Sequence, residues 1–227
     1  MTLQRTKKNA GIREGCMLWG GRESKRKFWL MSDHDFEVIA RERLERSALI
    51  AQSLAADPEL AGTIAVAARL IVKALANGHK LLLFGNGGSA ADAQHLAAEL
   101  MGRYRVERRA LPAIALTVNT SSVTAIANDY AFERVFARQV EALGVAGDVA
   151  LAISTSGESP NVLAGVDAAK RRGLATLGLT GKTGGRLRHL VDLAILAPTD
   201  DTPRVQEAHI LIGHILCELA ERELAQP

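Results

Sequence analysis

The chain carries a pair of residues, His95 and Glu99, whose types and spacing suit acid–base or metal chemistry. They lie four residues apart in a stretch of helical character, so both side chains fall on one face of the helix. Directly before this helix, the turn Gly85-Asn-Gly-Gly-Ser89 follows a short apolar run. A glycine turn that opens a helix offers free backbone N–H groups and the positive end of the helix dipole to an anion. We therefore expect a phosphorylated small molecule to bind beside the pair.

The glycine turn does not match the common nucleotide-binding motifs. It lacks the Gly-Lys-Ser/Thr ending of a Walker A loop, and it does not follow the GxGxxG pattern of dinucleotide-binding folds. A structural interpretation is a tight strand-to-helix turn, with Ser89 as the helix N-cap and Asp92 at the third helical position. The two interpretations are compatible, because the same glycines serve both.

A second group of candidate residues is the hydroxyl-rich run Ser154-Thr-Ser-Gly-Glu-Ser159. Four hydroxyl side chains within six residues follow an apolar strand and precede a helix that starts at Pro160. Hydroxyls and helix N-terminal amides bind phosphate without any need for lysine or arginine. One such hydroxyl is an ordinary helix cap, whereas four together favour a ligand site.

A third group lies on the last helix, where Gln206 and His214 are eight residues and roughly 80° apart. Both can face one pocket across two turns, whereas His209 has a different azimuth. His214 stands among apolar residues, so a buried core histidine is the simpler interpretation of this residue alone. Together with His95 and Glu99 the group forms a set of nitrogen and oxygen donors for zinc or a similar ion. The spacing alone leaves both interpretations open.

The elements that must position these groups alternate between helix and strand from Asp33 onward. The expected strands cover residues 80–84, 112–118, 148–153, 174–179 and 192–196. The expected helices cover residues 35–56, 58–76, 121–127, 131–143, 159–172 and 203–224, besides the one that holds His95. This alternation predicts an α/β fold, with a five-stranded parallel sheet and helices on both faces. The loops Gly85–Ser89, Asn119–Ser122 and Ser154–Ser159 then share one sheet edge, where such folds bind ligands.

Composition indicates one globular domain in a reducing compartment. The chain has 227 residues, of which 48% are hydrophobic and 23% charged. It contains no apolar run of the roughly 18 residues that a membrane span needs. The two cysteines, Cys16 and Cys217, form no disulfide framework, so we expect a cytoplasmic protein.

Residues 1–32 read as an N-terminal extension to a domain that spans residues 33–227. Eight of the 28 basic residues but only two of the 25 acidic ones lie in residues 1–31, so the remainder carries 20 basic and 23 acidic residues. A basic arm for nucleic acid is one interpretation. The extension lacks the continuous apolar core of a signal peptide. A disordered tail or a mis-assigned start, with the natural protein beginning near Met31, is the interpretation that we favour. We therefore expect no nucleic-acid and no membrane partner.

Taken together, the motifs resemble the sugar isomerase (SIS) family and, within it, the isomerases of phosphorylated heptoses. The resemblance covers about residues 35–225. It rests on an ordered series of blocks: Gly85–Ser89, His95–Glu99, Gly102–Arg105, Ala127–Asp129, Ser154–Gly157, Leu179–Gly181, Gln206–His209 and His214. An ordered series of this kind is far more specific than any one block.

The resemblance implies an aldose–ketose isomerase that converts D-sedoheptulose 7-phosphate to D-glycero-D-manno-heptose 7-phosphate, for the heptose of bacterial lipopolysaccharide. It implies a cytoplasmic homotetramer whose active sites are shared between subunits. One zinc ion per subunit would be held by His95, Glu99, Gln206 and His214. The phosphate would be held by Ser154, Thr155, Ser156 and Ser159. The other substrate contacts would fall on Asn86, Gly87, Gly88, Ser89, Glu99, Asn128, Asp129 and Gln206.

The implied chemistry agrees with the residues present. Aldose–ketose isomerisation moves a proton between adjacent carbons through an enediol, and it needs one base at carbon and one acid at oxygen. The carboxylate of Glu99 suits the first role and the imidazole of His214 the second. A metal ion beside them would polarise the sugar oxygens or organise the site, and the sequence leaves both roles open.

Two non-catalytic alternatives belong to the same family. One is the SIS protein that binds the replication initiator DnaA, and the other is a regulatory module that senses a sugar phosphate without turning it over. The first lacks a carboxylate matching Glu99 and an imidazole matching His214, so their presence here favours the enzyme. This chain departs from the enzyme pattern at Ala90-Ala91 and at Val118-Asn119-Thr120, which bears on sugar preference.

Overall fold

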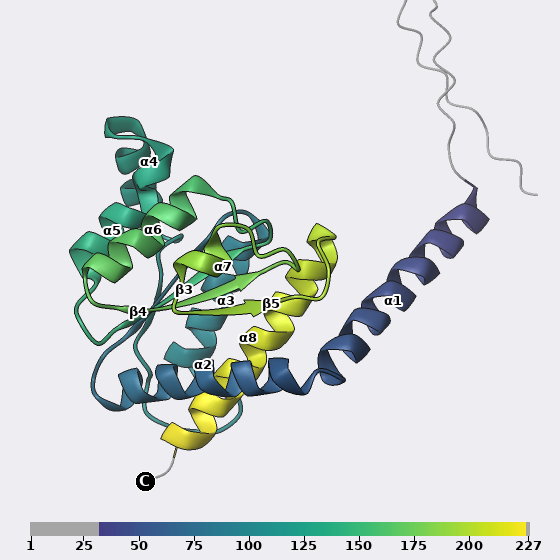
Figure 1. Ribbon diagram of the computed structural model, residues 1–227, viewed down its shortest axis with the longest axis horizontal. Coiled ribbons are helices and arrows are strands. Elements are labelled where there is room, and N and C mark those ends of the chain that lie inside the picture. The colour runs from purple at the N-terminus through teal and green to yellow at the C-terminus, as the bar shows by residue number, and fades with distance from the viewer. Residues whose placement is uncertain (1–31, 226–227) are drawn as a thin grey trace, which may run out of the picture.

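The computed structural model describes residues 32–225. The expectations for the N-terminal extension concern residues 1–31, which lie outside the described residues. The described chain has an α/β architecture built on one parallel sheet with the strand order β2-β1-β3-β4-β5 (Figure 1). Its strands are β1 (Leu81–Gly85), β2 (Ala113–Ala115), β3 (Val149–Ser154), β4 (Ala175–Thr180) and β5 (Leu193–Leu196). The predicted five-stranded parallel sheet is thereby confirmed.

Helices cover both faces of this sheet, as predicted. They are α1 (Asp33–Ala55), α2 (Pro58–Ala76), α3 (Gly88–Met101), α4 (Thr120–Asp129), α5 (Val135–Leu143), α6 (Pro160–Arg171), α7 (Leu187–Leu190) and α8 (Thr202–Leu224), with a 3-10 turn η1 (Phe132–Arg134) before α5. The sequence predicted one helix over residues 131–143, which is split here, and it did not anticipate α7. None of the described helices is both long and apolar enough to cross a membrane.

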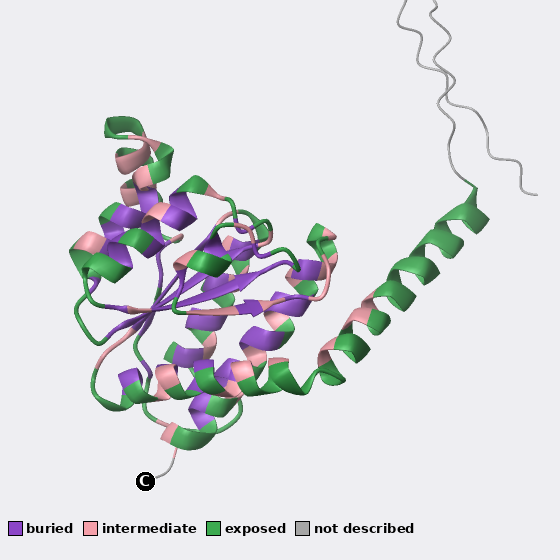
Figure 2. Ribbon diagram, in the orientation of Figure 1, coloured by how far each residue is buried: buried purple, intermediate pink, exposed green. Residues whose placement is uncertain are grey.

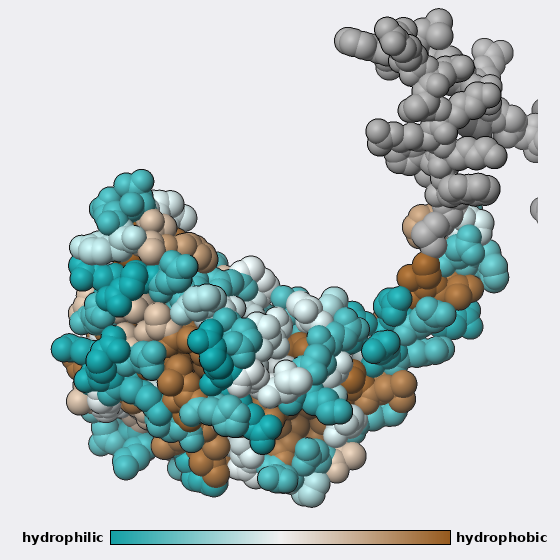
Figure 3. Space-filling model, turned by 45° about the horizontal axis from the view of Figure 1, so that its top comes forward, coloured by the Kyte–Doolittle hydropathy of each residue, from teal (hydrophilic) through white to brown (hydrophobic). Residues whose placement is uncertain are grey.

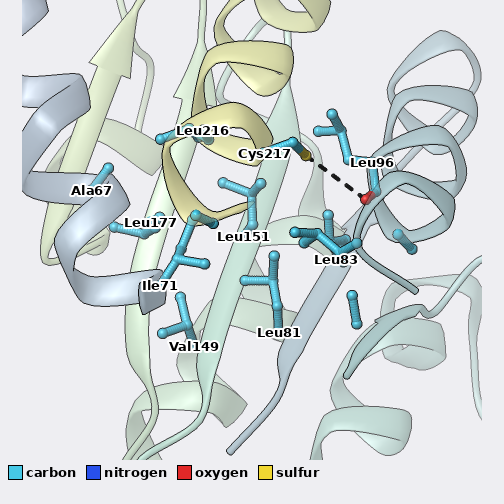
Figure 4. Close-up of a cluster of buried hydrophobic side chains, with 14 of the residues drawn as sticks. Ala67, Ile71, Leu81, Leu83, Leu96, Val149, Leu151, Leu177, Leu216 and Cys217 are labelled. Carbon is cyan, nitrogen blue, oxygen red and sulfur yellow. Dashed lines mark hydrogen bonds between the residues drawn. The ribbon is translucent and has the colours of Figure 1, made fainter. Parts of the chain in front are cut away.

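Side-chain alternation along the buried strands supplies one hydrophobic core to each face. Leu81 and Leu83 pack with α2, α3 and α8, whereas Leu82 and Phe84 pack with α5 and α6. Strands with two buried faces are continuously apolar, which explains the uninterrupted run that the sequence shows. The strands are the most deeply buried layer (Figure 2). Figure 4 shows the first core, where the Sγ of Cys217 donates to the carbonyl oxygen of Leu96.

Strand β2 is shorter than predicted, with three residues in place of the seven expected over 112–118. β2 is an edge strand, with β1 as its single neighbour in the sheet. The N–H of Leu116 still donates to Leu83, but its carbonyl oxygen accepts a hydrogen bond from the Gln139 side chain at 2.9 Å. The helix side chain therefore takes the group that would continue the strand.

Helix α1 projects from the body and packs little against it (Figures 1 and 2). A capping box between Ser32 and Asp35 starts it, yet none of its residues is buried. Its apolar side chains are largely exposed, among them Phe36 at 60% and Leu44 at 72%. Hydrophobic surface is visible along α1 and where it meets the body (Figure 3). The helix thus presents apolar side chains that the rest of residues 32–225 leaves exposed.

Candidate active site

The glycine turn between β1 and α3 is tight because of its glycines. Gly87 has φ +56°, a left-handed conformation that favours glycine, and it is the N-cap of α3. A Cβ at Gly85 would lie 2.6 Å from the carbonyl oxygen of Ile153 and 2.7 Å from the Cβ of Ser89. The prediction that Ser89 caps the helix is wrong. The helix starts earlier, no side chain caps it, and Ser89 is buried in the first turn.

Asp92 also differs from its predicted role, because a helix that starts at Gly88 places it beyond the third position. Its carboxylate is partly buried, and one of its oxygens has no hydrogen-bond partner in the described structure. Burial raises the pKa of Asp92 to about 6, against the opposing effect of nearby His95. Asp92 therefore faces the protein rather than the helix terminus.

A reciprocal amide pair joins the glycine turn to the first turn of α6, which directly follows the hydroxyl-rich loop. The Nδ2 of Asn86 donates to the Oδ1 of Asn161 at 2.8 Å, and the Nδ2 of Asn161 donates back to the Oδ1 of Asn86 at 2.9 Å. Asn161 lies in the first turn of α6 and is 2% exposed. The predicted sugar contact Asn86 is thereby held by a residue that the sequence analysis did not single out.

The hydroxyl-rich loop brings its predicted residues together at the start of α6. The Oγ atoms of Ser154 and Ser159 lie 3.2 Å apart, and the N–H of Gly157 donates to the Oγ of Ser154. Thr155 is half-buried and Ser156 is exposed. Ser159 is the N-cap of α6, but its hydroxyl makes no capping hydrogen bond, so it remains available to a ligand.

The segment that follows β4 packs against this hydroxyl-rich loop and holds its backbone. The carboxylate of Glu158 accepts from the backbone N–H of Arg186 at 2.7 Å and from its Nε at 2.8 Å. The N–H of Leu187 donates to the carbonyl oxygen of Gly157. A Cβ at Gly157 would collide with Gly184, so the close approach of the two loops requires glycine there. The hydroxyls therefore stand on a fixed backbone.

His95, Glu99 and His214 form the central cluster, which α3 and α8 build together. The Nε2 atoms of His95 and His214 lie 2.9 Å apart, and the Nε2 of His95 lies 3.3 Å from a carboxylate oxygen of Glu99. One donor atom from each residue falls within 4.8 Å of the others. The ring of Tyr104 stacks on that of His214, with centroids 5.7 Å apart. Two imidazoles and a carboxylate in this arrangement fit a divalent transition metal.

The remaining predicted residues of α8 divide between two places. The side-chain amide of Gln206 lies against Gly88 at the start of α3, where a Cβ would overlap it. His209 points into the interior, as its azimuth predicts, and is fully buried. Burial lowers its pKa to about 4, although a backbone contact with Thr180 acts in the opposite direction.

Asn128 and Asp129 lie at the end of α4, an element with no buried residue. Their side chains hydrogen-bond to each other at 2.9 Å. Within residues 32–225, no hydrogen bond or ion pair joins them to the other predicted site residues. Helix α4 packs on η1 and α5 and projects from the body (Figure 1).

The sequence analysis missed three residues that support the cluster. Tyr104 stacks on His214, and the buried pair Arg108 and Glu221 holds the loop that carries Tyr104. Glu221 follows His214 by seven residues, which places both on one face of α8. An acidic residue on the apolar face of a helix is the signal that identifies it.

The parallel sheet carries the glycine turn and the hydroxyl-rich loop at the carboxyl ends of β1 and β3. A sequence model described as the SIS domain matches residues 41–181. The chain belongs to the SIS domain family. Within that family, its relatives at high identity are phosphoheptose isomerases, and the sequence-based recognition of this group is confirmed.

Sequences and solved structures agree on these relatives. The phosphoheptose isomerase of a Nitratiruptor species is 60% identical over 72% of this chain and 87% of its own length. The solved phosphoheptose isomerase from Neisseria gonorrhoeae is 41% identical, with a TM-score of 0.77 over 82% of this chain and 99% of that one. The enzyme from Francisella tularensis is 38% identical, with a TM-score of 0.78 over 85% and 100%. The isomerase class is therefore shown.

Proposed function

We propose that this chain converts D-sedoheptulose 7-phosphate to D-glycero-D-manno-heptose 7-phosphate, in the supply of heptose for bacterial lipopolysaccharide. The observation that carries the proposal is the convergence of His95, Glu99 and His214 from two helices. The cluster thereby offers both an acid and a base, and the glycine turn lies at the start of the same helix, α3. The names of the relatives support the phosphorylated heptose as substrate class.

In the proposed reaction, Glu99 and His214 move the two protons of an enediol mechanism. The Glu99 carboxylate takes a proton from C1 of the ketose while the His214 imidazole donates one to the oxygen on C2. The resulting enediol then receives a proton at C2 and loses one from the oxygen on C1, which yields the aldose. Atoms and charges balance without any external co-reactant.

We further propose one zinc ion per subunit, held by His95, Glu99 and His214 with Gln206 as the fourth donor. The three clustered donor atoms fit such an ion, and the amide oxygen of Gln206, on the same helix as His214, is a further oxygen donor of the kind that such an ion takes. A bound ion of this kind supplies Lewis-acid polarisation of the sugar oxygens.

The two loops divide the rest of the substrate between them. We assign the phosphate to Ser154, Thr155, Ser156 and Ser159 at the N-terminus of α6, where helix amides and hydroxyls favour a dianion. The sugar contacts are Asn86, Gly87, Gly88, Ser89, Asn128, Asp129 and Gln206. Asn128 and Asp129 stand on the projecting helix α4, which supports a site completed by a neighbouring subunit.

We propose a cytoplasmic homotetramer as the working form. The exposed apolar face of α1 continues into a groove of about 370 Å³ between α1, α2 and α8. Its lining is almost wholly apolar: Ala51, Leu54, Ala55, Leu60, Ala61, Ile64, Leu211, Ile212, Ile215 and Leu219. Burial of these side chains between subunits would remove a large apolar surface from water.

The experiment that tests the function is turnover of D-sedoheptulose 7-phosphate before and after treatment with a chelator, followed by added zinc. Turnover that is lost on chelation and restored by zinc supports both the reaction and the metal. Turnover that survives complete metal removal contradicts the zinc and retains the enzyme. A folded oligomer without turnover contradicts the proposed reaction and favours a module that binds the sugar phosphate or a protein partner.

A further inference from the structure

A buried ion pair lies at one end of the catalytic cluster, between Glu221 of α8 and Arg108 of the loop that joins α3 to β2. Their side chains are 2% and 1% exposed, and the Nε of Arg108 lies 3.4 Å from the Oε1 of Glu221. A buried ion pair is weak evidence for stability, because desolvation of the charges offsets their attraction. The question is therefore what this pair specifies.

Glu221 holds the loop through its backbone. Its carboxylate accepts hydrogen bonds from three successive N–H groups, those of Tyr104 at 2.8 Å, Arg105 at 2.7 Å and Val106 at 3.2 Å. Hydrogen bonds to a charged acceptor are the strong ones. Glu221 thus anchors the segment that follows α3 to α8 through its backbone, and an exposed ion pair between Arg105 and Glu218 adds a side-chain contact.

Arg108 binds the same segment through carbonyl oxygens. Its guanidinium donates to those of Glu99 and Gly102 at 2.8 Å and to that of Arg109 at 3.0 Å. The last carbonyls of a helix have no partner within the helix. Arg108 therefore completes the last turn of α3, which is the turn that carries Glu99. An apolar pair in place of Arg108 and Glu221 would leave six backbone groups without these partners.

The anchored segment connects directly to the catalytic cluster. Tyr104, whose N–H is bound by Glu221, stacks on the ring of His214 at an interplanar angle of 28°. Glu221 and His214 are two turns apart on one face of α8. The pair thus ties the last turn of α3, which carries Glu99, to α8 at a point two turns beyond His214.

We propose that Glu221 and Arg108 are positioning residues of the active site, which set the placement of Glu99 relative to His214 through the segment that carries Tyr104. The catalytic part of this inference rests on the proposed isomerase function, whereas the geometric part does not. Displacement of a reacting group by about 1 Å costs on the order of 100-fold in rate.

The test compares Glu221→Gln and Arg108→Lys with a matched control, Asp148→Asn. Asp148 is also fully buried, pairs with Lys80 and accepts two backbone N–H groups, but it lies just before β3, and its hydrogen bonds and ion pairs in the described structure involve neither α3, α8 nor the segment that carries Tyr104. We expect both cluster variants to lower kcat by about 10-fold or more with KM within about twofold. The control should lose melting temperature while kcat stays unchanged. Arg108→Lys keeps the charge and serves if Glu221→Gln does not fold.

A second measurement reads the geometry without turnover. The ring signals of His214 in the metal-free protein, assigned with His214→Asn, report the stacked Tyr104 ring by NMR. We expect these signals to shift in Glu221→Gln and Arg108→Lys and to stay in place in Asp148→Asn. Unchanged His214 signals, or a kcat loss that follows melting temperature equally in all three variants, would overturn the proposal. If the wild type has no turnover, the proposed function fails and the NMR result alone decides the geometric part.

Discussion

The Nε2 atoms of His95 and His214 face each other at 2.9 Å, so one imidazole must donate and the other accept. Both Nε2 atoms can face an ion when each neutral ring carries its proton on Nδ1 instead. Glu99 stands 3.3 Å from the Nε2 of His95 and is the one carboxylate of the cluster. Glu99 is therefore the group whose proposed role, as the base at carbon, a single substitution can test.

We expect Glu99→Gln to lower kcat by at least about 100-fold, because an amide cannot take the proton from C1. Binding of the phosphorylated sugar should persist, since the two ligand loops are untouched. Calorimetry of sugar-phosphate binding beside the rate measurement separates these effects. Turnover retained in the metal-loaded variant would exclude Glu99 as the base.

The amide pair of Asn86 and Asn161 calls for a double-mutant cycle. We expect Asn161→Ala and Asn86→Ala each to weaken sugar-phosphate binding, and the double variant to be little worse than either, because each residue acts through the other. The coupling should be about 1 kcal/mol or more. Ser156→Ala is the comparison, since Ser156 contacts neither asparagine in the described structure. Its effect should add to that of Asn161→Ala. Simple additivity between the two asparagines would show that the pair is not a unit.

Helix α8 contributes His214 to the candidate site and buries His209 in the interior, so one helix carries both a proposed functional imidazole and a core imidazole. The pKa of His209 is lowered by burial to about 4 from an ordinary 6.5. Its folded-state pKa lies below the unfolded one. Stability from its burial is therefore complete above pH 6.5 and is lost as the pH falls from 6.5 toward 4.

We expect His209→Gln to reduce the acid sensitivity of the fold. The wild type should lose on the order of 3 kcal/mol more unfolding free energy than the variant between pH 7 and pH 4. Urea denaturation at a series of pH values, with metal removed, measures the difference. His189→Gln changes an exposed imidazole and is the control. Parallel curves for wild type and His209→Gln would contradict the assignment.

The elements were predictable from the sequence where burial alone decides them, and less so where a single side-chain contact decides. The strands β1, β3, β4 and β5 follow from continuous apolar runs, and every predicted end lies within one residue of the observed one. Strand β2 ends early because Gln139 captures the carbonyl of Leu116, a contact between residues 23 positions apart. The Ser89 cap failed because Gly87, with its positive φ, starts α3 two residues earlier.

The site shows the same division. His95, Glu99 and His214 could be found from residue type and helical spacing, because spacing fixes which side chains share a face. Asn161 and Glu221 could not be found that way, because their partners lie 75 and 117 positions distant in sequence. Pairing of this kind is fixed by the fold and leaves no periodic signal.

At the scale of the whole molecule, α1 stands out because none of its residues is buried within residues 32–225. Isolated helices are marginal in water, and most helices in proteins are stabilised by packing of one face. The hydrogen bonds of α1 to α8 begin at its middle, where Arg204 donates to the Arg43 carbonyl and the Ser47 hydroxyl. We therefore expect the N-terminal part of α1 to pack against a neighbouring subunit in the proposed tetramer.

We expect Leu44→Glu combined with Leu49→Glu to dissociate the oligomer, because each change places a charge at an exposed apolar position of α1 and so opposes burial of that helix. Sedimentation analysis should show a smaller species, and circular dichroism should show unchanged helix content. Val145→Glu, at an exposed apolar position far from α1, is the control and should leave the mass unchanged. A monomeric wild type, or an intact oligomer in the double variant, would contradict the assembly proposed for α1.

The buried thiol of Cys217 has a practical consequence. Burial raises its pKa to about 12, with the charge of Glu99 acting in the same direction, and its Sγ donates to the Leu96 carbonyl in the core between α3 and α8. A thiol in that state is almost never a thiolate at neutral pH, so alkylating reagents reach it only when the two helices separate. Alkylation of Cys217 can therefore report on local opening of the core without an engineered probe. The rate at which a mass-resolved label appears on its peptide therefore measures how often α3 and α8 separate, and these are the helices that carry the proposed base and acid.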